Sequence, residues 1–182
     1  MAEGEGEETI VRVARRSGWW MVALVLAAAS CGPASSGLKP VGEPDAGNAC
    51  PGGRRIWNLE IADLRAERSD TDRVRELVRE SLARSFPGCQ WASPARSEAP
   101  TIAIEIHRFA ADFDGSIYDA AADWTVSARS PSGQTLTQFD TDARVSRPNY
   151  RGSDNEREAL RQAFEQAVQR TAAGLRNLPE VP

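Results

Sequence analysis

The chain has 182 residues, a formal net charge of −4 and one histidine. Its 22 basic residues, almost all arginine, are interspersed with 26 acidic residues, so we predict no nucleic-acid partner. A single histidine excludes metal sites built from several histidines, and it leaves Ser-His-Asp or Cys-His chemistry only to His107. No glycine-rich phosphate loop or dinucleotide fingerprint occurs, and we expect neither a cofactor nor a metal.

The N-terminal part has the composition of an export signal. Residues 19–29 are apolar and uncharged, about half of the roughly 20 residues that a membrane-spanning helix needs. Three arginines precede them and small residues follow, an order typical of a secretory signal peptide. We therefore predict a signal peptide over residues 1–30. The acidic residues before the arginines do not suit such a signal, which favours a translation start near Val11.

The sequence Ala28-Ala29-Ser30-Cys31 resembles the lipobox of bacterial lipoproteins, in which the cysteine thiol takes a diacylglyceryl group and becomes the mature N-terminus. The resemblance implies a lipidated Cys31 and contact with the membrane through its acyl chains. It also implies the periplasmic face of the outer membrane as the location, because Gly32 rather than Asp follows the cysteine. An ordinary signal peptide with an unrelated cysteine is the alternative.

The composition changes again after Cys31. Residues 31–53 are rich in Gly, Pro, Ala and Ser, which predicts a flexible tether. Residues 54–178 have a usual length for one domain, and residues 179–182 form a short tail.

Cys50 and Cys89 remain once Cys31 carries lipid, an even number in an oxidising compartment. Cys50 lies just before the first predicted strand and Cys89 just after the helix that follows it. A helix that returns antiparallel to the strand brings these ends together, so we predict a structural disulfide. Two free thiols, or bonds to another chain, are the alternatives.

The domain begins with a strand and a helix. Trp57, Leu59 and Ile61 alternate with polar residues, which predicts a half-buried strand. Residues 69–88 then carry an apolar stripe at helical spacing, with Ser69 as a plausible N-cap and Pro87-Gly88 as the stop.

Alternation over residues 101–109 and 118–129 predicts the next two strands. A turn over residues 130–133 leads into a fourth strand over residues 134–145, whose alternation is less clear. Residues 153–179 open with capping-box spacing and continue as an amphipathic helix. The order β-α-β-β-β-α predicts an α+β two-layer sandwich: a mostly antiparallel four-stranded sheet with two helices on one face.

The polar side of this sheet holds the candidate binding residues, and we predict no catalytic residue among them. They are Glu60, Glu105, His107, Asp119, Asp123, Thr125 and Arg129. Carboxylates on a solvated face usually keep it hydrated; the alternative is a periplasmic enzyme that uses Glu105, His107 and Asp123. The motif Asp-Phe-Asp-Gly at 112–115 lacks the terminal Glu of a calcium loop and predicts a turn.

Residues 101–175 resemble the auxiliary lipoproteins of ABC-type intermembrane lipid transport systems, through the strand that ends at Arg108-Phe109, the strand that bears Trp124 and the terminal amphipathic helix. The part before residue 101 departs from that family. The element order with Arg147 and Tyr150 is similar to the lipopolysaccharide-assembly lipoprotein of the outer membrane, and the YajG-like lipoproteins are similar around 61–65.

All three resemblances imply a non-enzymatic envelope lipoprotein that works through protein or lipid contacts and needs no cofactor. We therefore predict an accessory of lipid or lipopolysaccharide transport that binds an envelope protein, or a lipid, through the sheet face or an edge strand.

Overall fold

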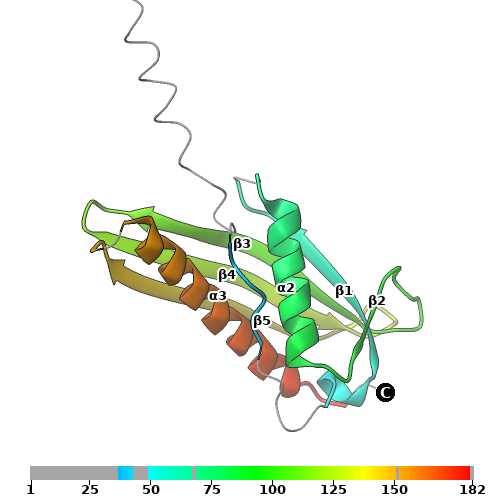
Figure 1. Ribbon diagram of the computed structural model, residues 1–182. Helices are drawn as coiled ribbons and strands as arrows, with labels where there is room; N and C mark the ends of the chain where they lie inside the picture. Colours follow the sequence, from blue (N-terminus) through cyan, green and yellow to red (C-terminus); the bar gives the residue numbers. More distant parts are fainter. Residues whose placement is uncertain (1–36, 43–48, 67–68, 151, 181–182) are drawn as a thin grey trace, which may run out of the picture. The chain divides into compact units, whose positions relative to one another are not determined.

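The computed structural model describes residues 37–42, 49–66, 69–150 and 152–180. The predicted signal peptide and Cys31 lie outside these residues. In chain order the elements are the 3-10 helix η1 (Pro51–Gly53), β1 (Ile56–Asp63), α2 (Thr71–Ser85), β2 (Gln90–Ala92), β3 (Thr101–Phe113), β4 (Ile117–Arg129), β5 (Thr135–Pro148) and α3 (Ser153–Arg176). The predicted α+β class with two helices is confirmed (Figure 1).

The strands form one five-stranded sheet in the order β2-β1-β3-β4-β5. β1 pairs in parallel with both β2 and β3, whereas β3, β4 and β5 form an antiparallel meander. The prediction of a mostly antiparallel four-stranded sheet is therefore roughly right but not exact, because the sheet has a fifth strand and β1 pairs in parallel on both sides. A three-residue strand is too short to show an alternating pattern. The helix α2 is the crossover between β1 and the parallel strand β2, and the chain then passes to β3, which also runs in the direction of β1.

Both helices cover the same face of the sheet, α2 over β1 and α3 over β4 and β5 (Figure 1). The predicted alternation is confirmed in β3, where Ile102, Ile104 and Ile106 are fully buried. Trp124 of β4 packs edge-on against Phe164 of α3, with ring centroids 6.1 Å apart. These side chains fill one core between the sheet and the helices, which leaves the other sheet face open.

The helices begin within two residues of the predicted positions. The N-cap of α2 is Asp70 rather than Ser69, and the N-cap of α3 is Gly152. The apolar stripe of α2 is buried as its spacing predicts, because Val74, Leu77 and Leu82 are each at most 1% exposed.

Part of the predicted tether is packed onto the domain. Residues 37–42, here called the N-terminal segment, lie between α2 and α3 (Figure 1), and Leu38 is only 3% exposed. Its carbonyl oxygen accepts a hydrogen bond from Arg73 at 2.9 Å, and the Val41 amide donates to the Ser81 hydroxyl at 3.1 Å. One buried leucine and backbone hydrogen bonds hold this segment, and composition alone did not reveal them.

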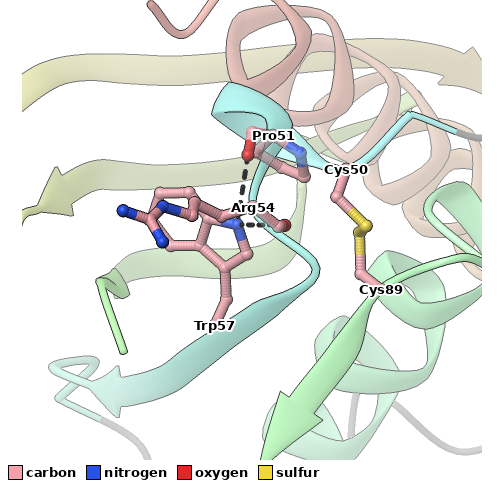
Figure 2. Close-up of a disulfide and its surroundings, with 5 residues drawn as sticks. All are labelled: Cys50, Pro51, Arg54, Trp57 and Cys89. Carbon is pink, nitrogen blue, oxygen red and sulfur yellow. Dashed lines mark hydrogen bonds between the residues drawn. A yellow bond between two sulfur atoms is a disulfide. The ribbon is translucent and has the colours of Figure 1, made fainter. Parts of the chain in front are cut away.

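The structure contains the predicted disulfide between Cys50 and Cys89, whose Cα atoms are 5.4 Å apart (Figure 2). Beside it, the indole nitrogen of Trp57 donates to the carbonyl oxygens of Pro51 and Arg54, at 3.1 Å each. The bond closes a loop with a sequence separation of 39, which is worth about 4 kcal/mol in the chain-entropy model. It joins the chain just before η1 to the residue that precedes β2.

Candidate functional site

The open face of the sheet brings most of the predicted site residues together. Glu105 on β3 lies opposite Thr125 on β4, and Thr125 lies opposite Asp140 on β5. Asp123 and Asp119 follow on the same side of β4, opposite Asp142 and Ser146. Three long neighbouring strands thus present a largely polar surface, interrupted by Ala110 and Ala121, that neither helix covers.

Glu60 and Arg129 lie apart from this centre. Glu60 is exposed on β1, where it pairs with Ala103 of β3, and Arg129 is at the end of β4 opposite Thr135. We therefore define the open face by its central residues, Glu105, His107, Asp119, Asp123, Thr125, Asp140, Asp142 and Arg144.

A hydrogen-bonded chain runs across three strands at the level of Thr125. The Thr125 hydroxyl donates to Asp140 Oδ1 at 2.7 Å, and His107 Nε2 lies 3.0 Å from the same hydroxyl oxygen. Since Thr125 has one proton, given to Asp140, Nε2 is the donor to Thr125. The register shifts between Ile106 and Arg108, and this irregularity turns the His107 ring toward Thr125. The hydroxyl is thus committed as a donor to Asp140.

Arg144 bridges two aspartates on the next row. Its guanidinium lies 3.2 Å from Asp123 Oδ2 and 3.1 Å from Asp142 Oδ1. Burial, together with the nearby Asp142 carboxyl, raises the pKa of Asp123 above its ordinary value, while Arg144 and Arg108 oppose the rise. Asp123 Oδ1 is buried and has no hydrogen-bond partner among the described residues. The row therefore holds one buried carboxylate oxygen that no donor of the described residues satisfies.

A cavity of about 390 Å³ lies beside the open face, between the chain that follows β1 and the edge of β3. His107 and Arg108 line it, together with Asp70 and Asp112, but Glu105 and Asp123 do not. The three residues of the enzymatic alternative therefore do not meet in this cavity. Within the described ranges, no three His, Cys, Asp or Glu side chains are grouped as metal ligands.

A buried charged cluster at the end of β1 was not among the predicted site residues. Arg65 donates to Asp63 Oδ2 and to Asp70 Oδ1, both at 2.8 Å, and Thr71 donates to Asp63 Oδ2 at 2.8 Å. Burial opposes ionisation of Asp63, but the hydrogen bonds from Arg65 and Thr71 outweigh it and lower the pKa to about 2. The sequence does contain a signal for this cluster. The alternation of Trp57, Leu59 and Ile61, extended by two residues, places Asp63 on the face of β1 that the helices cover.

Neither helix in the described part of the chain has the length and apolar composition needed to cross a membrane.

No protein-family model matches the sequence, and no curated protein is significantly similar to it. Solved structures do share the fold. The protein XCC0632 from Xanthomonas campestris, of family DUF330, is 18% identical, with a TM-score of 0.52 over 76% of this chain and 92% of its own.

Two further similar structures are lipoproteins. A minor lipoprotein from Acinetobacter baumannii is 13% identical, with a TM-score of 0.43 over 70% of this chain and 96% of its own. Lipoprotein GNA1162 from Neisseria meningitidis is 11% identical, with a TM-score of 0.43 over 65% and 97% of the two chains. At these identities the likeness concerns the fold.

Proposed function

We propose that this chain is a lipid-anchored binding module of the bacterial envelope, without catalytic activity of its own. The lipobox-like sequence before Cys31 supports the anchor. The disulfide between Cys50 and Cys89 supports an exported domain, because such bonds persist in oxidising compartments. The narrower proposal places it on the periplasmic face of the outer membrane, on the resemblance carried by Gly32.

The open face of the sheet carries the proposal of partner binding. It is built on strands of 13 and 14 residues, so its side chains are held on a rigid support. Its polar groups are ordered by hydrogen bonds from Thr125 to Asp140 and from Ser146 to Asp119. A preorganised, solvent-facing surface binds a partner at low entropic cost.

The proposed partner is an envelope protein, and a lipid is the alternative ligand. The narrower proposal is an accessory role in lipid or lipopolysaccharide transport. The resemblance of residues 101–175 to auxiliary transport lipoproteins supports this role. The separation of Glu105 and Asp123 from the cavity beside His107 favours a binding module over the enzymatic alternative.

The anchor is tested by Cys31→Ser in the producing bacterium, with Ser35→Ala as the matched control. We expect the control to sediment with membranes and Cys31→Ser to move to the soluble fraction, because the acyl chains have lost their attachment. Mass spectrometry of the control should show the acylated N-terminus. Complete membrane retention of Cys31→Ser would contradict the proposal.

Partner binding is tested with a photo-crosslinking amino acid at single exposed positions. Asp140 and Arg144 represent the open face, and Glu76 on α2 and Gln169 on α3 are controls on the covered side. We expect crosslinks to one envelope protein from the open-face positions alone. Equal yields from all four positions, or none from the open face, would remove the support for this surface.

A further inference from the structure

The N-terminal segment fixes where the chain enters the domain. Gly37 lies against the side chain of Arg157 in the first turns of α3. The carbonyl oxygen of the next residue, Leu38, is bonded to Arg73 near the start of α2. The chain therefore joins the domain at the end that holds the N-termini of both helices (Figure 1).

Little chain is left between this point and the proposed anchor. Only residues 32–36 separate Cys31 from Gly37, and a chain of that length reaches about 20 Å when fully extended. With the lipid anchor proposed above, this end of the domain must stay within that distance of the bilayer. A 23-residue flexible tether, as the composition predicted, would not impose such a limit.

Exposed aromatic residues gather at the same end. Phe113 is 48% exposed and Tyr150 is 87% exposed, two of the three exposed large hydrophobic residues in the described part of the chain. Phe113, at the end of β3, stacks on Tyr118 of β4 with ring centroids 4.7 Å apart. The Asn149 amide donates to the Ser116 carbonyl oxygen at 2.8 Å, which places Tyr150 beside this hairpin.

Contacts connect these aromatic residues to the entry point. Tyr118 pairs across the strands with Arg147, and Arg147 Nη2 lies 3.8 Å from Glu158 Oε1 on α3. Glu158 lines the same cavity as Gly37, next to Arg157. The entry point and the aromatic residues are thus parts of one end of the domain.

We propose that Phe113, Tyr118 and Tyr150, here called the aromatic end, rest in the headgroup region of the bilayer that holds the acyl chains. This inference depends on the lipid anchor of the proposed function. The two tyrosines, whose rings carry a polar tip, favour the membrane–water interface, and Phe113 adds exposed apolar surface beside them. Arginine stems such as that of Arg147 cover apolar surface while the guanidinium stays in water. The open face, which begins at this end and extends along β3–β5, then stands away from the membrane and stays accessible to a partner.

The test uses the full lipidated protein, reconstituted into vesicles of phosphatidylethanolamine and phosphatidylglycerol. Because Cys31 carries lipid and Cys50 is bonded to Cys89, an introduced cysteine is the single free thiol. Phe113→Cys and Tyr150→Cys each receive an environment-sensitive dye, and Ser132→Cys in the turn at the opposite end of β4 is the matched control. All three positions are exposed, so labelling leaves the core intact.

We expect nitroxide-labelled headgroups to quench the dye at positions 113 and 150 at least about twofold more than at 132, since only the former lie at the interface. A Gly-Ser insertion of about twelve residues after Ser36 should reduce this difference, because the domain is then free to leave the surface. Protein that floats with the vesicles but shows equal quenching at all three positions would contradict the proposed contact of the aromatic end with the headgroups. It would leave the lipid anchor intact. Protein that fails to float would overturn the anchor and, with it, this inference.

Discussion

Two clusters in this domain place an arginine between two aspartates, and they differ in almost everything else. Arg65 binds Asp63 and Asp70 at 2.8 Å, and these side chains are at most 8% exposed. Arg144 binds Asp123 and Asp142 at 3.2 and 3.1 Å on the open face, where its own side chain is 58% exposed. The pKa of Asp63 is lowered to about 2, whereas the pKa of Asp123 is raised.

Hydrogen bonds to the carboxylate, rather than burial alone, account for the opposite directions of the two pKa shifts. Burial disfavours the ionised form of both aspartates. Asp63 receives bonds from Arg65 and Thr71 that more than compensate. Asp123 faces another carboxyl and keeps a buried oxygen without a hydrogen-bond partner in the described structure. We infer that the buried cluster stabilises the fold, while the exposed cluster, whose arginine is 58% exposed, contributes little to stability.

Replacing the two arginines should give the largest contrast. We expect Arg65→Met to lower the free energy of unfolding by about 3–5 kcal/mol, because it leaves Asp63 and Asp70 buried without their countercharge. Arg144→Met, in an exposed cluster, should cost less than about 1 kcal/mol. Urea unfolding of both variants measures the difference, and equal losses would contradict the division into a structural and a solvated cluster.

The second largest expected effect is a loss of the stabilisation by Asp63 at acidic pH. The folded pKa of Asp63 lies below the ordinary value of 3.8, so its contribution is fully present above that pH and is lost as the pH falls toward 2. The shift corresponds to about 2 kcal/mol. The stability difference between the wild type and Asp63→Asn should therefore shrink by that amount between pH 5 and pH 2.

Thermal unfolding over this pH range measures the effect, with Asp112→Asn as an exposed control. A difference that stays constant with pH would show that Asp63 is not held ionised by its partners.

The elements that the sequence predicted correctly are those with a regular local pattern of apolar residues. The stripe of α2 and the alternation in β3 and β4 depend on neighbouring residues, and burial follows them closely. The parallel pairing of β1 with β3, the three-residue strand β2 and the docking of Leu38 depend on contacts between distant parts of the chain. No short window of sequence contains that information.

The open face shows the same limit. Its residues on β3 and β4 follow from alternation, but Asp140 and Asp142 were missed because the pattern of β5 is weak. The approach of His107 to Thr125 depends on the register shift after Ile106, which strand alternation does not predict. Asp63, in contrast, was predictable in principle, because it continues the covered side of β1.

Neutralising Asp123 should have a smaller effect of the opposite sign. Its folded pKa is raised by burial and by Asp142, so ionisation costs stability at neutral pH and the cost disappears as the pH falls through the folded pKa. We expect Asp123→Asn to stabilise the domain at pH 7 by up to about 1 kcal/mol, and to match the wild type below pH 3.8. Urea unfolding at pH 7 and pH 3 measures both parts, and a loss of stability at pH 7 would mean that Asp123 is satisfied as an anion.

The smallest expected effect on stability is that of Arg144→Met, and its consequence appears in titration instead. Arg144 lowers the pKa of Asp123, against the effects of burial and Asp142, so its removal should raise that pKa further. Carboxyl NMR of the two variants should show the rise for Asp123 in Arg144→Met and none in Arg129→Met, at the far end of β4. An unchanged pKa of Asp123 in Arg144→Met would mean that solvent already screens the charge of Arg144 from this carboxylate. A confirmed rise means that the guanidinium of Arg144 lowers the pKa of Asp123 against the combined effect of burial and Asp142.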